Sequence, residues 1–155
     1  MQLLLVAVGK LRPALREVAD DYLRRLGRFM PIEEREVKEA GRTATGSLQR
    51  DAEAKRLLAA VPERSDVVLL DVDGERWTSE ELAGHLDTWR REARDRTLII
   101  GGASGVTPAV RERAGTVWSL GALTLPHELA RVVVVEQLYR ASTILRGEPY
   151  HRGAR

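Results

Sequence analysis

The chain reads DVVLLD over residues 66–71 and TLIIGGASG over residues 97–105. Each stretch contains a short, continuous apolar run, which is typical of a strand buried on both faces of a parallel sheet. Glycine follows the second run directly, as expected where a strand ends in a tight loop. The predicted strands are residues 3–8, 32–37, 66–71, 97–100, 116–120 and 122–125.

Helical patterns fill the segments between these runs. Thr78 and Glu81 have the spacing of a capping box, and Leu82, Leu86 and Trp89 then mark one apolar helix face. Alternating strands and helices predict an α/β domain with a mostly parallel sheet flanked by helices. Neither a linker nor a repeat divides the chain, so we expect residues 1–155 to form a single domain. The other predicted helices begin at Pro13, with a face of Leu15, Val18, Tyr22 and Leu26, at Ser47 and at Pro108.

The C-terminal third contains one long predicted helix, which starts near Pro126. The valines at positions 132–135 favour a strand by propensity, but no breaker interrupts the sequence before Gly147. The first half of this helix is apolar nearly all round, which predicts burial or an interface between two chains. Glu136 lies within it, and we expect its carboxylate to pair with Arg140 one turn later.

Composition limits the class of protein. A chain of 155 residues is long enough for one domain with a real core. Hydrophobic residues make up 43% and charged residues 31%, the balance of a soluble globular protein. No apolar run approaches the roughly 20 residues of a membrane helix, and the N-terminal sequence is no secretory signal. The absence of cysteine excludes disulfides, thiolate metal sites and cysteine nucleophiles, and it fits the cytoplasm.

Charge is distributed unevenly along the chain. The net charge of +2 does not by itself indicate a nucleic-acid partner. Residues 10–28 contain six basic side chains against three acidic ones, and residues 131–155 contain five arginines against two glutamates. On charge alone, a solvated arginine-rich surface is favoured over a nucleic-acid site.

The glycine loop at residues 101–105 is the first candidate binding feature. Ligands of parallel α/β sheets bind beyond the carboxyl ends of the strands, where glycines let backbone approach closely. The loop matches neither the dinucleotide fingerprint nor the P-loop, and Ser104 does not stand in a hydrolase elbow. A plain tight turn and a ligand-binding loop therefore both remain open at this point.

The three histidines do not have the spacing of metal ligands, so no metal site is predicted. We expect His85 to pack against the apolar helix face. His127 stands at a helix start, where it either caps the helix or binds a ligand. His151 lies between Tyr150 and Arg152 in the C-terminal tail. That tail is either a frayed end or a group suited to base stacking, proton transfer and phosphate contact.

Five stretches together resemble the ribosomal RNA large subunit methyltransferase H family, a bacterial branch of the SPOUT methyltransferases. The resemblance covers essentially the whole chain and is most specific in LTLPHELARVVVVEQLYRA and the terminal YHR. The stretches are LLLVAVGKLRPALREVADDYLRRL (3–26), VVLLDVDGERWTSEELA (67–83), IIGGASG (99–105), WSLGALTLPHELARVVVVEQLYRA (118–141) and RGEPYHR (146–152).

The resemblance implies transfer of a methyl group from S-adenosylmethionine to N3 of pseudouridine 1915 in the 23S ribosomal RNA of the assembled ribosome. It also implies a cytoplasmic homodimer and a deep trefoil knot in the C-terminal half that forms the cofactor pocket. The ribosome is then the partner, and neither DNA nor a membrane is expected. Knotted chains are otherwise almost absent among proteins, so no general folding rule predicts this one.

Carried over residue by residue, the resemblance implies a cofactor pocket and a catalytic tail. In the tail, His151 would accept or relay the N3 proton, Tyr150 would stack on or orient the base, and Arg152 would hold phosphate. A bound water or hydroxide remains an alternative proton acceptor. The implied cofactor residues are Leu70, Gly101, Gly102, Gly105, Leu120, Gly121, Ala122, Leu123, Thr124 and Leu125.

Two other classes of function are consistent with the sequence. One is a ribosome-binding module without activity, which would bind no cofactor. The other is a SPOUT methyltransferase acting on another RNA, such as transfer RNA. Relatives of that second kind usually carry an added RNA-binding domain, for which this chain leaves little length.

Overall fold

A computed structural model describes residues 1–41 and 46–153, apart from the side chain of His151. Its regular elements alternate between strands and helices along the chain, as the sequence predicts. They are β1 (Leu3–Val8), α1 (Pro13–Gly27), β2 (Ile32–Val37), α2 (Gly46–Ala60), β3 (Asp66–Arg76), α3 (Ser79–Glu92), β4 (Arg96–Ile100), α4 (Pro108–Arg113), β5 (Thr116–Ser119), α5 (His127–Leu145) and η1 (Pro149–Gly153).

The described strands form one five-stranded sheet in the order β2-β1-β4-β3-β5, and every pairing in it is parallel. Because neighbouring strands all run the same way, each connection crosses from one end of the sheet to the other through a helix. The carboxyl ends of the strands therefore gather at one edge. The predicted α/β class with a parallel sheet is confirmed.

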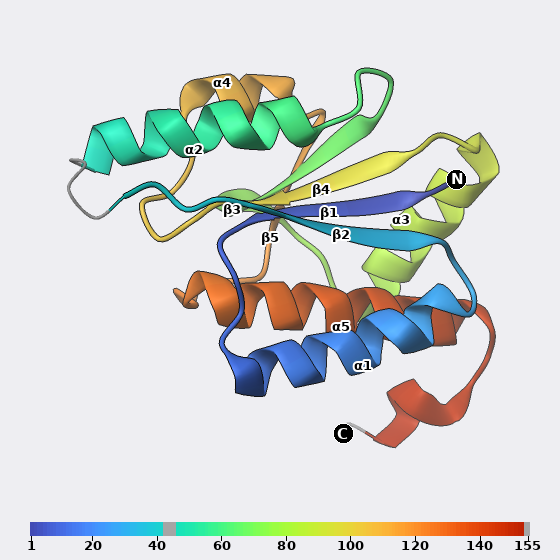
Figure 1. The fold of residues 1–155 in the computed structure, drawn as a ribbon. Coiled ribbons are helices and arrows are strands. Elements are labelled where there is room, and N and C mark those ends of the chain that lie inside the picture. The colour runs from blue at the N-terminus through green and yellow to red at the C-terminus, as the bar shows by residue number, and fades with distance from the viewer. Residues whose placement is uncertain (42–45, 154–155) are drawn as a thin grey trace.

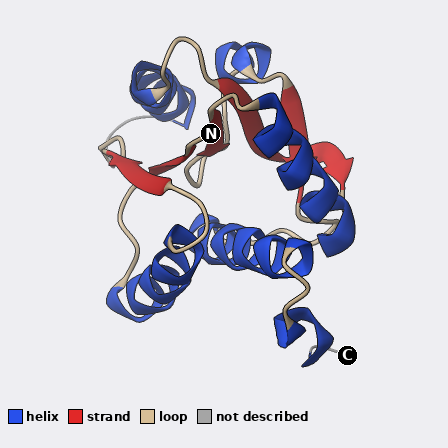
Figure 2. Ribbon diagram, turned by 90° about the vertical axis from the view of Figure 1, so that its right-hand side faces the viewer, coloured by secondary structure: helices blue, strands red, loops and turns tan. Residues whose placement is uncertain are grey.

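Helices cover both faces of the sheet, with α2 and α4 on one side and α1, α3 and α5 on the other (Figures 1 and 2). Alternate residues of β1 divide between two cores: Leu3 and Leu5 face one, while Leu4 and Val6 face the other. Burial on both faces explains why β1 and residues 98–100 of β4 are apolar. The sheet is thus the middle of three layers.

Several local predictions are confirmed by the structure. Thr78 accepts a hydrogen bond from the backbone of Glu81 while the Glu81 carboxylate accepts one from the backbone of Thr78, so the capping box is complete. The valine run at 132–135 is helical and lies within α5. Val134 and Val135 are fully buried, because α5 packs against both α1 and α3.

Two local predictions are wrong. Residues 122–125 are not a strand: β5 ends at Ser119, and Gly121 then adopts a φ of 120°, which takes the chain out of extended geometry. Val18 belongs to the predicted apolar face of α1 but is 42% exposed. The buried stripe of that helix runs instead through Ala19 and Leu26.

Arg131 on α5 is the largest of the fully buried side chains in the described residues, with only 1% of its surface exposed. Its guanidinium forms an ion pair with Glu36 of β2 and donates to the carbonyls of Val8 (3.1 Å) and Gly9 (2.9 Å). It ties α5 to the carboxyl end of β1. Arg131 is therefore structural, although the sequence counts it among the arginines of a basic C-terminal end.

We predict that Arg131→Met lowers the free energy of unfolding by about 3 kcal/mol, because Glu36 and two carbonyls lose a buried partner. Arg91→Met is the matched control, since Arg91 pairs with Asp87 on the surface with 73% of its side chain exposed. That change should cost less than about 1 kcal/mol. Denaturant unfolding measures both, and equal losses would contradict a structural role for Arg131.

Candidate functional site

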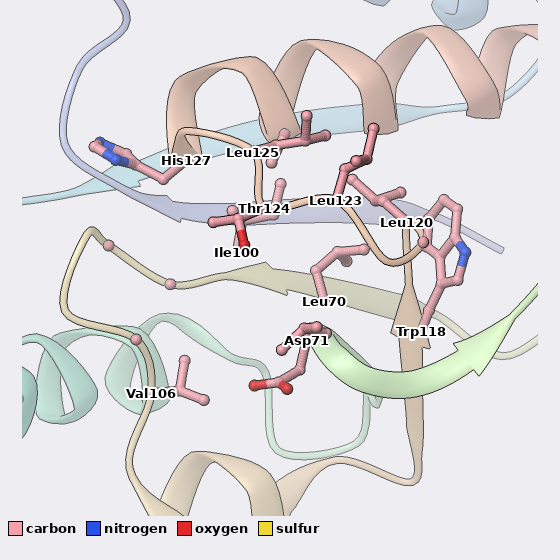
Figure 3. Close-up of a pocket in the computed structure, with 16 residues that line it drawn as sticks. Leu70, Asp71, Ile100, Val106, Trp118, Leu120, Leu123, Thr124, Leu125 and His127 are labelled. Carbon is pink, nitrogen blue, oxygen red and sulfur yellow. The ribbon is translucent and has the colours of Figure 1, made fainter.

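A pocket opens at the carboxyl edge of the sheet, beside the ends of the regular pairing in the neighbouring strands β4, β3 and β5. Leu70 ends the regular part of β3, Ile100 ends β4, and β5 ends at Ser119. This is the edge at which ligands of parallel α/β folds bind. Figure 3 shows Leu70, Leu120 and Thr124 around this pocket, which has a volume of about 240 Å³.

Nine of the ten predicted cofactor residues line the pocket, and Ala122 does not. Most of the surface is apolar side chain or backbone, which suits a flat, weakly polar ligand group. Leu123 is 81% exposed, so an apolar side chain stands at the rim. The lining residues are Leu70, Asp71, Val72, Ile100, Gly101, Gly102, Gly105, Val106, Trp118, Leu120, Gly121, Leu123, Thr124, Leu125, His127 and Ala130.

The glycines of the loop after β4 are required by its own packing. A Cβ built on Gly101 would lie 2.6 Å from Val106 Cγ1, and one built on Gly102 would lie 2.8 Å from Glu53 Oε1. Gly105 has a φ of +82°, which side chains rarely adopt. The sequence suggests close approach of a ligand as the reason for these glycines, but the fold also accounts for them: Gly101 packs on Val106, Gly102 packs on Glu53 of α2, and Gly105 has a positive φ.

We predict that Gly101→Ala destabilises the protein through its clash with Val106, rather than by blocking a ligand. The free energy of unfolding should fall by about 1–3 kcal/mol, the usual cost of overpacking. In a chain that already carries Val106→Ala, the same change should cost clearly less. A double-mutant cycle by denaturant unfolding measures this coupling, and additive effects would contradict the clash.

Sequence reasoning missed several lining residues. Asp71 is the titratable one among them. His127, which the sequence left open between a helix cap and a ligand contact, also lines the pocket, and Figure 3 shows both residues beside it. The signal for Asp71 was present, because a charged residue directly after a buried strand lies at the edge where ligands bind. Val106 and Ala130 carried no such signal, since small apolar residues occur throughout any core.

The C-terminal tail forms the short helix η1 and is held to the body of the protein by Tyr150. The Tyr150 hydroxyl donates to Glu136 Oε1 at 3.0 Å and hydrogen-bonds with the Tyr22 hydroxyl at 3.1 Å. Its ring meets that of Tyr139 edge-on. Burial, the hydrogen bond with Tyr22 and the charge of Glu136 raise the pKa of Tyr150 well above its usual range. Tyr150 therefore stays protonated at neutral pH.

Glu136 pairs with Arg140 as predicted, with 2.7 Å between Oε1 and Nη2. Burial alone would lower the pKa of Arg140, but the hydrogen bond and charge of Glu136 outweigh it and raise that pKa. The Arg140 guanidinium lies over the Tyr150 ring, 5.0 Å from its centroid. The pair thus supports the tail as well as α5.

The tail does not reach the pocket within one chain. His127, the first residue of α5, lines the pocket, whereas η1 follows the last turn of α5 and folds back against it (Figure 1). Tyr150 contacts Glu136, nine residues after His127, which is about 14 Å along a helix that rises about 1.5 Å per residue. Within one chain, the structure does not bring the predicted catalytic residues to the predicted cofactor residues. Arg152 is exposed, and the side chain of His151 lies outside the described part.

His85 is the remaining histidine whose side chain the structure describes. His85 packs on Trp77 with ring centroids 3.9 Å apart, as its position on the capped helix suggested. Within residues 1–41 and 46–153, no group of three histidine or acidic side chains is arranged to hold a metal ion. None of the described helices is long and apolar enough to cross a membrane.

Comparison with known proteins identifies the family. The family model described as "Predicted SPOUT methyltransferase" matches residues 1–151. Ribosomal RNA large subunit methyltransferase H of Methylococcus capsulatus is 46% identical over 98% of this chain and 100% of its own length. The protein of that name from Anaeromyxobacter sp. is 47% identical with the same coverage. The chain is a member of the ribosomal RNA large subunit methyltransferase H family.

Membership of this SPOUT methyltransferase family agrees with the resemblance seen in the sequence. Among solved structures, the SpoU methyltransferase AviRb from Streptomyces viridochromogenes aligns with a TM-score of 0.49 and 15% identity. That alignment covers 95% of this chain and 61% of the other.

Proposed function

We propose that the protein transfers a methyl group from S-adenosylmethionine to N3 of pseudouridine 1915 in the 23S ribosomal RNA of the assembled ribosome. The observation that carries the proposal is the pocket at the carboxyl edge of the sheet, in a chain whose relatives are named ribosomal RNA methyltransferases along their whole length. The proposal places the protein in the cytoplasm, where ribosomes are, as one domain over residues 1–155.

The pocket fits the cofactor in chemical character. Leu120, Leu123 and Leu125 offer aliphatic surface for the adenine, and the half-buried Gly101 places backbone at the pocket wall. When bound, S-adenosylmethionine supplies an electrophilic methyl group, so the protein needs only to align the two reactants and to remove one proton.

We also propose that the C-terminal half is threaded as a deep trefoil knot around this pocket, as the SPOUT resemblance implies.

The tail supplies what the pocket lacks. N3 of the base must lose its proton as the N–C bond forms and the C–S bond breaks. His151 would take or relay that proton, because imidazole titrates near neutral pH. Tyr150 would orient the base as a neutral phenol, and Arg152 would pair with RNA phosphate.

We propose a homodimer, because the tail does not reach the pocket within one chain: Tyr150 contacts Glu136, about 14 Å along α5 from His127. A second copy can bring its tail to the pocket of the first. An apolar surface is available for the pairing: Val18 on α1 is 42% exposed, and Val133 on α5 is only half-buried. Two copies also bring two sets of arginine side chains to one RNA target.

Methyl transfer from labelled S-adenosylmethionine tests the proposed function. Whole ribosomes, isolated large subunits, free 23S RNA and transfer RNA are offered side by side, from cells that lack the modification. We expect label in whole ribosomes at a single pseudouridine, and at least tenfold less in free RNA. Label on transfer RNA alone would contradict the substrate, and binding to ribosomes without cofactor binding would contradict an enzyme.

Mixing two inactive variants tests whether the site is shared. Ala130→Phe fills the pocket from the first turns of α5, and a chain ending at Tyr150 lacks His151 and Arg152 while keeping the contacts of Tyr150. We predict that each variant is inactive alone and that an equal mixture, after random exchange of chains, regains about a quarter of the activity, because half of the dimers are mixed and each of these has one intact site. Binding curves for the cofactor should show loss only in Ala130→Phe.

Ala109→Phe is the matched control, because Ala109 is exposed on α4 and does not line the pocket. It should retain full activity. A mixture that stays inactive, although mass measurement shows that mixed dimers form, would mean that each tail serves its own chain.

A further inference from the structure

Residues 71–74 form a β-bulge inside β3, beside the pocket. Leu70 pairs with Trp118 of β5, and Glu75 pairs with the same residue. The residues between them therefore leave the ladder, and the strand then rejoins it. Such irregularities occur preferentially next to active sites, where they turn a side chain toward a ligand.

Gly74 shows that this interruption is a fixed feature of the sequence. A Cβ at this position would lie 2.6 Å from the carbonyl carbon and oxygen of Val117 and 2.8 Å from the carbonyl carbon of Trp118. These are backbone atoms of β5 and cannot move aside as a flexible side chain can. Only glycine allows β3 to return to the sheet at this point.

The interruption directs Asp71 into the pocket. Its Oδ1 accepts the backbone N–H of Asp73 at 3.0 Å, and its Oδ2 accepts Arg111 Nη2 at 2.8 Å. The side chain is 15% exposed, and Figure 3 shows it near Leu70 and Val106. Among the described lining residues, Asp71 is the only acid, and none is lysine or arginine. The pocket therefore carries one carboxylate in mostly apolar surroundings.

We propose that Asp71 makes the pocket select a positively charged cofactor over its uncharged product. The proposal rests on the function proposed above. S-adenosylmethionine carries a sulfonium cation, whereas S-adenosylhomocysteine has a neutral thioether at the same place and is otherwise nearly identical. A carboxylate attracts the sulfonium cation but has no such attraction for the neutral thioether. The attraction is stronger in a partly apolar pocket than in water.

Arg111 limits the strength of this selection. Its guanidinium is 43% exposed, so water screens its charge more than that of the enclosed carboxylate. It holds Asp71 in one orientation without cancelling its field inside the pocket. Methyl transfer removes the positive charge from the cofactor, so the attraction ends when the reaction does and release of the product is favoured.

Isothermal calorimetry with three ligands tests the proposal. They are S-adenosylmethionine, S-adenosylhomocysteine and sinefungin, an analogue whose protonated amine places a cation where the sulfonium stands. We expect Asp71→Asn to raise the Kd of the two cationic ligands about tenfold and that of S-adenosylhomocysteine less than twofold. Asp73→Asn is the matched control: it removes the same charge from an exposed position two residues away and should leave all three Kd values unchanged.

Arg111→Gln is an independent test, for which we expect the opposite change in ligand preference. Without the guanidinium, the preference for cationic ligands over S-adenosylhomocysteine should increase about threefold. Equal weakening of all three ligands by Asp71→Asn, or an equal effect of Asp73→Asn, would overturn the role of Asp71 alone. Failure of the unaltered protein to bind S-adenosylmethionine would instead contradict the proposed function.

Discussion

Arg131 places a guanidinium in the interior, where a cation is costly unless its donors find acceptors. Glu36 and the carbonyls of Val8 and Gly9 accept hydrogen bonds from its two terminal nitrogens, and all three lie at the carboxyl ends of β1 and β2. The start of α5 is thereby held at this edge of the sheet. Residues 120–126 run directly from β5 to α5, so their course beside the pocket is fixed at both ends.

A second contact supports the same arrangement. Glu128, also in the first turn of α5, accepts the backbone N–H of Arg12 at 2.6 Å. The first turns of α5 are thus joined to β2 by an ion pair, and to the end of β1 and the segment after it by hydrogen bonds to backbone. The pocket therefore depends on contacts between the N-terminal and C-terminal parts of the chain, which lie more than a hundred residues apart in sequence.

Much of the sheet and part of the pocket could be predicted from sequence, because a strand that is buried on both faces has a continuous run of apolar residues. The apolar runs at 3–8 and 97–100 identified two parallel strands, and the glycines after Ile100 identified one loop of the pocket. The family motifs supplied the loop at 120–125. These signals are local, so short stretches of sequence were enough to read them.

What could not be predicted depends on contacts between distant segments. Arg131 is one arginine among several in the sequence, and only its partners on β1 and β2 show that it is structural. The apolar pattern of β3 stops at Asp71, so the hydrophobic pattern does not predict that the strand pairs with β5 again at Glu75. The separation of Tyr150 from the pocket follows from the direction of α5, which no local motif encodes.

A crystal structure of the protein with S-adenosylmethionine tests the central claim most directly, that the pocket at the carboxyl edge holds the cofactor and a second chain completes the site. We predict cofactor density against Leu70, Gly101 and residues 120–125, with the tail of the other chain across the pocket mouth. Cofactor bound elsewhere, or a pocket closed only by its own chain, would contradict the account.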